Sequence, residues 1–353
     1  MSRPRGRLQI IGTSLLGLAL LAGLITYVGW GAVYDALRRA DGRYLLAALA
    51  AYALFFLVRG IRWRILLRPV KREVTVKEAT GLTAAGWLVN SFTILKAGDV
   101  TRAAVLAKRH RVTFTSVFAT VAVERILDLL GIAVLAAAGL MLIPERGLPS
   151  WFATALNLAW VIPVAAILVL WVAVTWKQGF LRFTEKVLSF LPGKVQGKLV
   201  RFAESCILGA EGLVRSPKAA AQVAPLTLLM SVLQAGVFVC LFLAFLPTPD
   251  VAAVAAGVPF FLLSFGLPVT PGNVGTYEVA FAAIYVALGF TAEQVAPVAI
   301  LTHLGTSVIV ALLGAAALVH LGIDFTRLKE ERDVAHETPT APAPASQPQE
   351  VAP

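Results

Sequence analysis

Cysteine is scarce in this sequence, with only Cys206 and Cys240 among 353 residues. One lies in a basic connector and the other in an apolar run, so no disulfide framework or cysteine metal site follows. Charge is scarce as well, at 14% of the residues, whereas 58% are hydrophobic. Several apolar runs exceed the roughly 20 residues that cross the hydrocarbon core of a bilayer. This composition excludes an ordinary soluble domain and predicts an integral membrane protein.

The sequence also lacks the common enzyme motifs. It contains no G-x-S-x-G, H-E-x-x-H, C-x-x-C or G-x-x-x-x-G-K-[ST] pattern. The largest connector, at about residues 177–221, is short, basic and amphipathic, which favours an interfacial helix over a catalytic domain. We therefore expect no enzyme, no cofactor and no metal.

Acidic residues are fewer than basic ones, with 20 Asp and Glu against 31 Lys and Arg. In a soluble protein this excess would point to nucleic acid. Here the basic residues flank apolar runs, so membrane topology and anionic lipid headgroups at the inner face explain them, and no nucleic-acid partner is expected. From about residue 329 the chain is rich in Pro, Ala and Gln, which predicts a disordered cytoplasmic tail over 329–353.

The predicted fold is an all-α, polytopic transmembrane helical bundle in a domain over residues 1–328. It has about six full spans and two interrupted apolar regions, 79–111 and 251–290, each expected as a re-entrant helical hairpin. The alternative is a bundle of eight spans. The first span, after three arginines, is expected as an uncleaved signal anchor. The full spans are 8–30, 44–67, 114–143, 151–176, 222–246 and 292–321.

The distribution of basic residues predicts the orientation. If both ends of the chain lie in the cytoplasm, 26 of the 31 Lys and Arg fall on the cytoplasmic side. The order of spans then repeats with opposite orientation, as repeat 1 over about 8–143 and repeat 2 over about 151–321. Gly98-Asp99-Val100 also aligns with Gly272-Asn273-Val274, and Arg125 with His303 after a chosen gap. Inverted repeats are typical of secondary transporters, whose sites lie between broken helices near the midplane.

The second interrupted region, FGLPVTPGNVGTYE, places helix breakers inside an apolar run. Pro271 removes a backbone donor, and Gly272 and Gly275 allow conformations closed to other residues. One interpretation is a kinked helix pair or a short external loop. The other is a re-entrant tip around Asn273 whose free N–H groups face an anion. Glu278, in the first turn after the tip, is suited to capping the next helix.

The first interrupted region ends in KAGDVTR, which places Asp99 at a candidate helix N-cap and Arg102 one turn later. Arg102 and the preceding Lys96 are able to bind phosphate, although at the cytoplasmic face they could simply meet headgroups. Asn90 precedes this tip and aligns with Ser264 of the second region.

Charged residues also lie inside predicted spans. Glu124, Arg125 and Asp128 fall about ten to fourteen residues into the 114–143 span, near mid-bilayer. Charges at that depth normally face the bundle interior or a cavity, as a structural ion-pair cluster or as the lining of a headgroup or proton pathway. His303 lies at the corresponding depth of the last span and is either a packing residue or a proton relay.

Three further arginines, Arg59, Arg62 and Arg64, end the second span. We expect them to extend to the inner interface, with inward contact of Arg59 or Arg62 with a phosphate as the alternative.

These ordered motifs resemble a flippase-like membrane family that includes the transmembrane region of lysylphosphatidylglycerol synthases, and the resemblance covers about residues 8–321. Family members fused to an aminoacyl-transferring domain make and translocate an aminoacylated lipid; this chain matches only the membrane part. The family often has a proline where this chain has Ile94. The motifs are Asn90…Gly98-Asp99-x-x-Arg102, Glu124-Arg125-x-x-Asp128 and Pro268-x-x-Pro271-Gly272-x-x-Gly275-x-x-Glu278.

The expected function is translocation of a polar or charged lipid, such as an aminoacylated phospholipid or a lipid-linked sugar, across the cytoplasmic membrane. The alternatives are a membrane glycosyl- or acyl-group transferase with Asp99 or Glu124 as base, and a non-catalytic partner of a lipid-modifying enzyme. A second copy of the chain or a lipid-synthesis enzyme are further candidate partners. The expected headgroup site comprises Asn90, Asp99, Arg102, Glu124, Arg125, Asp128, Pro271, Gly272, Asn273, Gly275, Glu278 and His303.

Overall fold

A computed structural model describes most of the membrane region. The described residues are 18–19, 21–23, 26, 29–91, 93, 97–142, 161, 164–165, 167–169, 171–214, 216–264 and 270–321. Most of the predicted spans 8–30 and 151–176, the tail 329–353, and Ile94, Lys96 and Pro268 lie outside these ranges.

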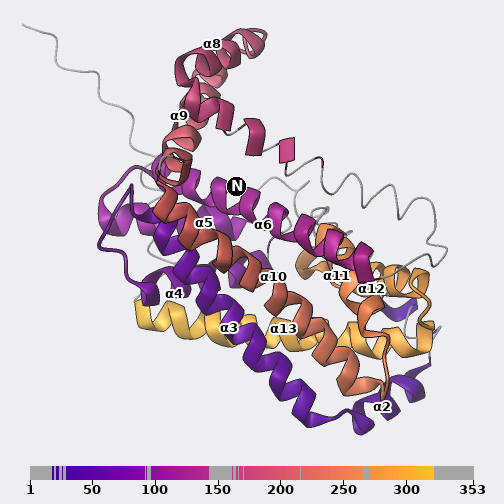
Figure 1. Ribbon diagram of the computed structural model, residues 1–353. Helices are drawn as coiled ribbons and strands as arrows, with labels where there is room; N and C mark the ends of the chain where they lie inside the picture. The colour runs from indigo at the N-terminus through magenta and orange to yellow at the C-terminus, as the bar shows by residue number, and fades with distance from the viewer. Residues whose placement is uncertain are drawn as a thin grey trace, which may run out of the picture.

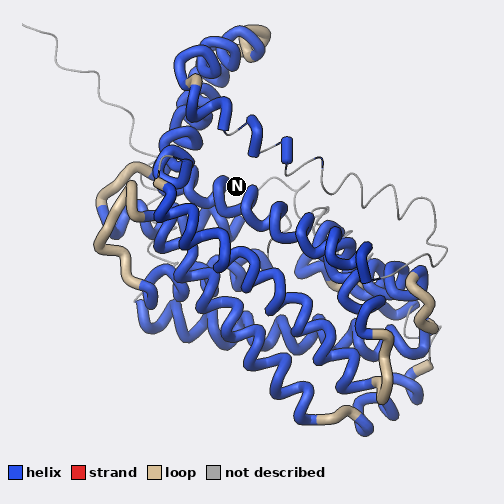
Figure 2. Tube along the Cα trace, viewed as in Figure 1, coloured by secondary structure: helices blue, strands red, loops and turns tan. Residues whose placement is uncertain are grey.

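Helices make up the described part of the chain, and no strand occurs within it (Figures 1 and 2). The predicted all-α fold is therefore confirmed. The elements are α2 (Trp30–Arg39), α3 (Gly42–Leu67), α4 (Val76–Ser91), α5 (Ala97–His110), α6 (Phe114–Leu142), α8 (Lys177–Val187), α9 (Gly193–Val214), α10 (Pro217–Phe245), α11 (Val251–Ser264), the 3-10 turn η1 (Pro271–Asn273), α12 (Thr276–Ala287) and α13 (Ala292–Leu321).

Three described helices, α3, α10 and α13, are long and apolar enough to cross a membrane. They coincide with the predicted spans 44–67, 222–246 and 292–321, and α6 coincides with 114–143. Polar residues fix two of the starts. The Asp41 carboxylate accepts the Arg43 backbone N–H at 2.9 Å before α3, and the Ser216 hydroxyl accepts the Ala219 N–H at 3.2 Å before α10. Such N-caps satisfy backbone donors that a helix leaves free.

The two interrupted regions form helices too short to cross. Helices α4 and α5 have 16 and 14 residues, and α11 and α12 have 14 and 12. At about 1.5 Å per residue, each is shorter than a hydrocarbon core of about 30 Å. In each region the paired helices pack against one another, so both regions are helical hairpins.

Helices of the first half of the chain pack on helices of the second half. Helix α3 packs along α10, α4 lies on α13, and α6 lies on α11 (Figure 1). The first helix of each hairpin therefore rests on the last long helix of the other half. The two hairpins also meet, because Gly272 of the second lies close to Ser91 at the end of α4.

Aromatic packing fills the core around α10 and α12. The Phe242 ring lies 4.7 Å from that of Tyr285, and Phe281 lies 4.6 Å from Tyr285 and 5.1 Å from Phe261. The Tyr285 hydroxyl donates to the Val254 carbonyl at 3.1 Å, which satisfies the polar end of this buried ring. The aromatic core thus holds the second hairpin against α10.

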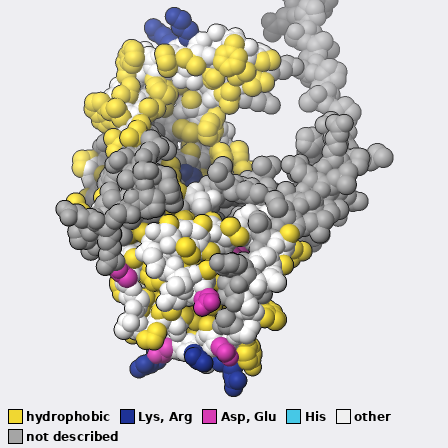
Figure 3. Space-filling model, turned by 90° about the vertical axis from the view of Figure 1, so that its right-hand side faces the viewer, with side chains coloured by type: hydrophobic (Ala, Val, Ile, Leu, Met, Phe, Trp, Pro, Cys, Tyr) yellow, Lys and Arg dark blue, Asp and Glu magenta, His cyan; other side chains and the backbone are white. Residues whose placement is uncertain are grey.

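Helix α8 and the start of α9 extend away from the bundle, and the rest of α9 packs on α6 (Figures 1 and 2). Helix α8 has no buried residue, and Phe183 and Phe190 are exposed on this extension. The predicted amphipathic connector at 177–221 is therefore helical, with apolar side chains free to contact lipid. In Figure 3, most of the basic side chains that can be seen lie at the upper and lower edges of the view.

Candidate functional site

A buried ionic cluster joins α3, α5 and α6 and is defined by the seven residues Arg59, Arg62, Asp99, Arg102, Glu124, Arg125 and Asp128. Glu124 is at its centre and is completely buried. One carboxylate oxygen lies 2.5 Å from Nη2 of Arg59, and the other lies 3.0 Å from Nη1 of Arg102. Such a buried charge is tolerated only when it is paired and hydrogen-bonded.

Arg59 and Arg62 point into the bundle, so the expectation that they extend to the interface is wrong. Nη2 of Arg59 lies 2.7 Å from the Asp128 carboxylate, and Arg62 pairs with the other oxygen of Asp128. Arg62 also donates to the Thr227 hydroxyl of α10 at 3.2 Å. The two arginines are three positions apart, which places both on the side of α3 that faces α6.

Asp99 and Arg102 extend the ionic cluster from α5. Asp99 lies in the first turn of α5, which begins at Ala97, so it does not serve as the predicted N-cap. Its carboxylate lies 3.0 Å from Nη2 of Arg102 and 3.3 Å from Nε of Arg125. The Arg102 guanidinium also lies over the Trp63 ring, 4.4 Å from its centroid, which adds a cation–π contact.

Two glycines bring α4 and α5 together. A Cβ atom on Gly98 would lie 1.8 Å from the Gly86 carbonyl oxygen, so no side chain fits at this crossing. The Asn90 side chain accepts the Gly98 N–H at 2.8 Å. Asn90, which we predict as a headgroup ligand, therefore also caps the start of α5.

The tip of the second hairpin uses unusual backbone conformations at Thr270–Gly275. Gly272, Asn273 and Gly275 have φ values of 64°, 58° and 77°. Glycine adopts this left-handed region freely, and asparagine is one of the few other residues that does so. A Cβ on Gly272 would lie 3.0 Å from the Ser91 carbonyl oxygen, so the tip closely approaches the end of α4.

Glu278 and His303 hold this tip in place. The Gly275 N–H donates to Glu278 at 2.8 Å, which confirms the predicted capping role. The other Glu278 oxygen lies 2.7 Å from Nδ1 of His303, whose Nε2 lies 2.9 Å from the Gly272 carbonyl oxygen. The His303 ring also stacks on Tyr277, with 4.3 Å between centroids.

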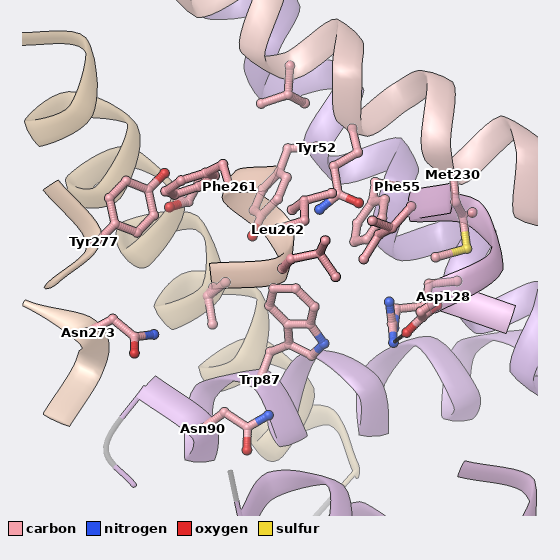
Figure 4. A pocket seen from close by; sticks show the side chains of 18 of the residues that line it. Tyr52, Phe55, Trp87, Asn90, Asp128, Met230, Phe261, Leu262, Asn273 and Tyr277 are labelled. Atoms are coloured by element: carbon pink, nitrogen blue, oxygen red, sulfur yellow. Dashed lines mark hydrogen bonds and ion pairs between the residues drawn. The ribbon is translucent and has the colours of Figure 1, made fainter. Parts of the chain in front are cut away.

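A cavity of about 450 Å³ lies between the ionic cluster and the second tip (Figure 4). In Figure 4, Asp128 and Asn273 lie well apart, with Trp87 between them. Arg102, Glu124, Gly275 and Glu278 do not line the cavity, so they support its walls. The predicted site residues that line it are Asn90, Asp99, Arg125, Asp128, Gly272, Asn273 and His303.

The expected headgroup site leaves out several residues of the wall, although inward contact of Arg59 or Arg62 is the alternative given for these arginines. Arg59 and Arg62 line the cavity, together with Trp87 from α4 and Gln234 from α10. The three-residue spacing of the arginines was the available signal, whereas Trp87 and Gln234 lie in apolar sequence without a motif. Among the residues that the structure describes, no group of three or more His, Cys, Asp and Glu side chains could hold a metal ion.

The sequence is similar to known membrane proteins. A family model described as the lysylphosphatidylglycerol synthase TM region matches residues 14–314. Glycosyltransferase AglD of Haloferax volcanii is 28% identical over 372 residues, an alignment that covers 95% of this chain and 59% of the relative. A UPF0104 membrane protein of Methanothermobacter thermautotrophicus is 26% identical over 326 residues, covering 87% of this chain and 94% of the relative. No solved structure matches the chain.

Proposed function

Because the chain belongs to the family of the lysylphosphatidylglycerol synthase transmembrane region, we propose that it translocates a polar or charged lipid across the cytoplasmic membrane. Its membership makes it a membrane protein of lipid or cell-envelope biosynthesis. In the proposed mechanism, the headgroup enters the cavity between the two hairpins while its hydrocarbon tails stay in the bilayer.

The observation that carries the proposal is a cavity inside an apolar bundle whose wall includes charged and amide side chains. An ionisable group within a membrane costs free energy, and such groups usually mark a substrate or ion pathway. Here Arg125 and Asp128 face an open volume of about 450 Å³, a size that suits a small-molecule ligand. A purely structural ionic cluster would not need an adjoining cavity with amide and hydroxyl side chains.

The hairpins support a re-entrant topology with inverted repeats. All four hairpin helices are shorter than the bilayer core. The contact of α4 with α13 has a counterpart in the contact of α11 with α6, because α4 and α11 each begin a hairpin and α13 and α6 each end a half. Helical ends in a wet, protein-lined cavity avoid the free-energy cost of bare backbone groups in lipid. We place both ends of the chain in the cytoplasm, following the distribution of basic residues.

The transferase alternative has less support. It needs Asp99 or Glu124 as a base, yet each carboxylate is already paired with at least two guanidinium groups, which occupy the oxygens that would accept a substrate proton. The matching relative that is named as a glycosyltransferase extends well beyond the aligned region. A non-catalytic role beside a lipid-synthesis enzyme would not require the cavity.

Translocation is tested with purified protein in liposomes that carry a fluorescent lipid in both leaflets. We expect the protein to expose inner-leaflet lipid to a membrane-impermeant quencher, and protein-free liposomes to leave it protected. An Asn273→Cys variant provides the matched control, because a bulky maleimide at this cavity residue should block movement and the unmodified variant should not. Equal movement before and after modification would contradict transport through this cavity.

The same variant tests the orientation. Cys206 and Cys240 are first replaced, although burial raises the pKa of the Cys206 thiol to about 11 and slows its reaction. A membrane-impermeant reagent should then label Cys at position 273 only from outside the cell. Labelling from the cytoplasmic side alone would reverse the proposed topology.

A further inference from the structure

The ionic cluster carries more positive than negative charge. It joins four guanidinium groups to three carboxylates, which leaves one positive charge in excess. Across the cavity, both ring nitrogens of His303 face oxygen acceptors, at 2.7 Å and 2.9 Å. Glu278 is therefore engaged by His303, and it does not line the cavity. The excess positive charge beside the cavity comes from the ionic cluster.

Arg125 presents this excess charge to the cavity. Its side chain is 42% exposed, whereas those of Arg59, Arg62 and Arg102 are at most 3% exposed. Its closest carboxylates, on Asp99 and Asp128, are 3.3 Å away, compared with 2.5 Å for the shortest contact of Arg59. Arg125 is thus the least engaged arginine of the ionic cluster and the one a ligand can reach.

The carboxylates of the wall are already engaged. Asp99 contacts Arg102 and Arg125, while Asp128 contacts Arg59, Arg62 and Arg125. Glu124 is completely buried behind the wall. A cationic headgroup would therefore compete with arginines for every carboxylate in the described part of the wall, and it would meet their net positive charge.

The remainder of the wall suits an uncharged, hydroxyl-rich group. Amide side chains from Asn90, Gln234 and Asn273 line the cavity, and each amide group can both donate and accept hydrogen bonds. Rings of Tyr52 and Trp87 supply flat apolar surfaces beside them (Figure 4). This pairing of amides with aromatic rings fits a polyol, which has hydroxyl groups on its edges and C–H groups on its faces.

We infer that the headgroup is an anionic phosphate ester bearing a neutral polyol, such as glycerol or a sugar, and not an aminoacyl or other cationic group. The inference rests on the proposed function, because it takes the ligand to be a lipid. The phosphate pairs with Arg125, whose planar guanidinium matches phosphate geometry, and the polyol extends towards Asn273.

Binding is tested by thermal unfolding of the protein in an uncharged detergent. The probes are short-chain phosphatidylglycerol, its lysyl ester and short-chain phosphatidylcholine at equal concentrations. A ligand that binds the folded state raises the unfolding midpoint with concentration, which yields its Kd. We expect a Kd for phosphatidylglycerol about tenfold or more below that of the lysyl ester. Equal or tighter binding of the lysyl ester would overturn the inference.

Two arginines on neighbouring helices provide a matched pair of variants. Arg125→Gln should weaken binding of phosphatidylglycerol by about tenfold or more. Arg109→Gln, which removes a similarly exposed guanidinium paired with Glu78, should leave the affinity unchanged. Arg125→Glu should move the preference towards the lysyl ester. Equal effects of Arg125→Gln and Arg109→Gln would contradict a phosphate site at Arg125.

The outcomes separate this inference from the proposed function. Selective phosphatidylglycerol binding without lipid movement in liposomes would support the headgroup and contradict translocation. Preferred movement of the lysyl ester would support translocation and overturn the inferred headgroup chemistry. Stabilisation by free glycerol phosphate as strong as that by the lipid would support the headgroup chemistry and contradict a lipid substrate.

Discussion

The two walls of the cavity place different chemistry on two long helices, α6 and α13. Helix α6 contributes Arg125 and Asp128 to a network of full charges, whereas α13 contributes His303 and Thr306, which bond mainly to neighbouring side chains and backbone carbonyls. A substitution in the charged wall on α6 leaves buried ions unpaired, which costs several kcal/mol each. A substitution in the wall on α13 removes a few hydrogen bonds, each worth about 1 kcal/mol. The bundle thus combines a rigid charged wall with one that adjusts more readily.

Removing the central carboxylate should break the charged wall and cause the largest loss. Glu124→Gln leaves four arginines facing two carboxylates, and we expect it to lower the free energy of unfolding by about 3–5 kcal/mol. The measurement is the thermal midpoint in detergent. Glu78→Gln is the control, because its partner Arg109 is half-exposed and can be solvated by water. Equal losses in the two variants would show that the ionic cluster is not the rigid element.

A double-mutant cycle on Glu278 and His303 tests the second wall. Because the two side chains are in direct contact, we expect a coupling energy of about 0.5–3 kcal/mol between Glu278→Gln and His303→Gln. Unfolding of the two single variants, the double variant and the parent protein gives this value. Additive effects would mean that the pair does not hold the tip.

The tip backbone should respond more weakly. Gly272→Ala forces a side chain into the left-handed region and towards the Ser91 carbonyl, at a cost of about 1–2 kcal/mol. Gly236→Ala, in the middle of α10 with open space around it, should be neutral or stabilising by up to about 1 kcal/mol. Unfolding midpoints of the two alanine variants compare them directly. A neutral Gly272→Ala would indicate that the tip has another conformation.

A surface ion pair outside both walls should have the smallest effect. Hydrogen bonds from Arg43 lower the pKa of Asp41, so any stabilisation is present above the ordinary pKa and is lost as the pH falls through the lowered value. Both side chains are accessible to water, and we expect Arg43→Gln to leave the midpoint at pH 7 unchanged. Unfolding scans at pH 7 and pH 3 measure this. A large fall in the unfolding midpoint at pH 7 would show that this surface ion pair stabilises the fold as strongly as the contacts of the cavity walls.

The sequence predicted where the long helices lie and which of them carry charged residues. It predicted less well which partners those charged side chains contact. Hydropathy alone located α3, α6, α10 and α13, and the first-turn position of Glu278 indicated its cap. The inward orientation of Arg59 was not predictable, because an arginine near a helix end can reach either water or a buried partner. Only the packing of α3 on α6 brings Glu124 and Asp128 within reach.

Asp99 illustrates the same limit on a shorter scale. A carboxylate after a Gly in KAGDVTR fits an N-cap by local rules. The structure starts α5 two residues earlier, and Asp99 pairs instead with Arg102 and Arg125. Local preferences thus identified the helix start to within a turn, while tertiary charges decided what the side chain does.

Trp87 gives the cavity a built-in optical reporter. The ring lines the cavity, lies 5.5 Å from the Arg59 guanidinium and packs edge-on against Phe56 at 5.4 Å. Indole fluorescence shifts to shorter wavelengths when water leaves its surroundings and is altered by nearby charge. A headgroup that displaces water from this wall will therefore change the emission of Trp87. Because the chain has seven tryptophans, occupancy can be followed without a dye in a variant that keeps Trp87 and replaces the other six.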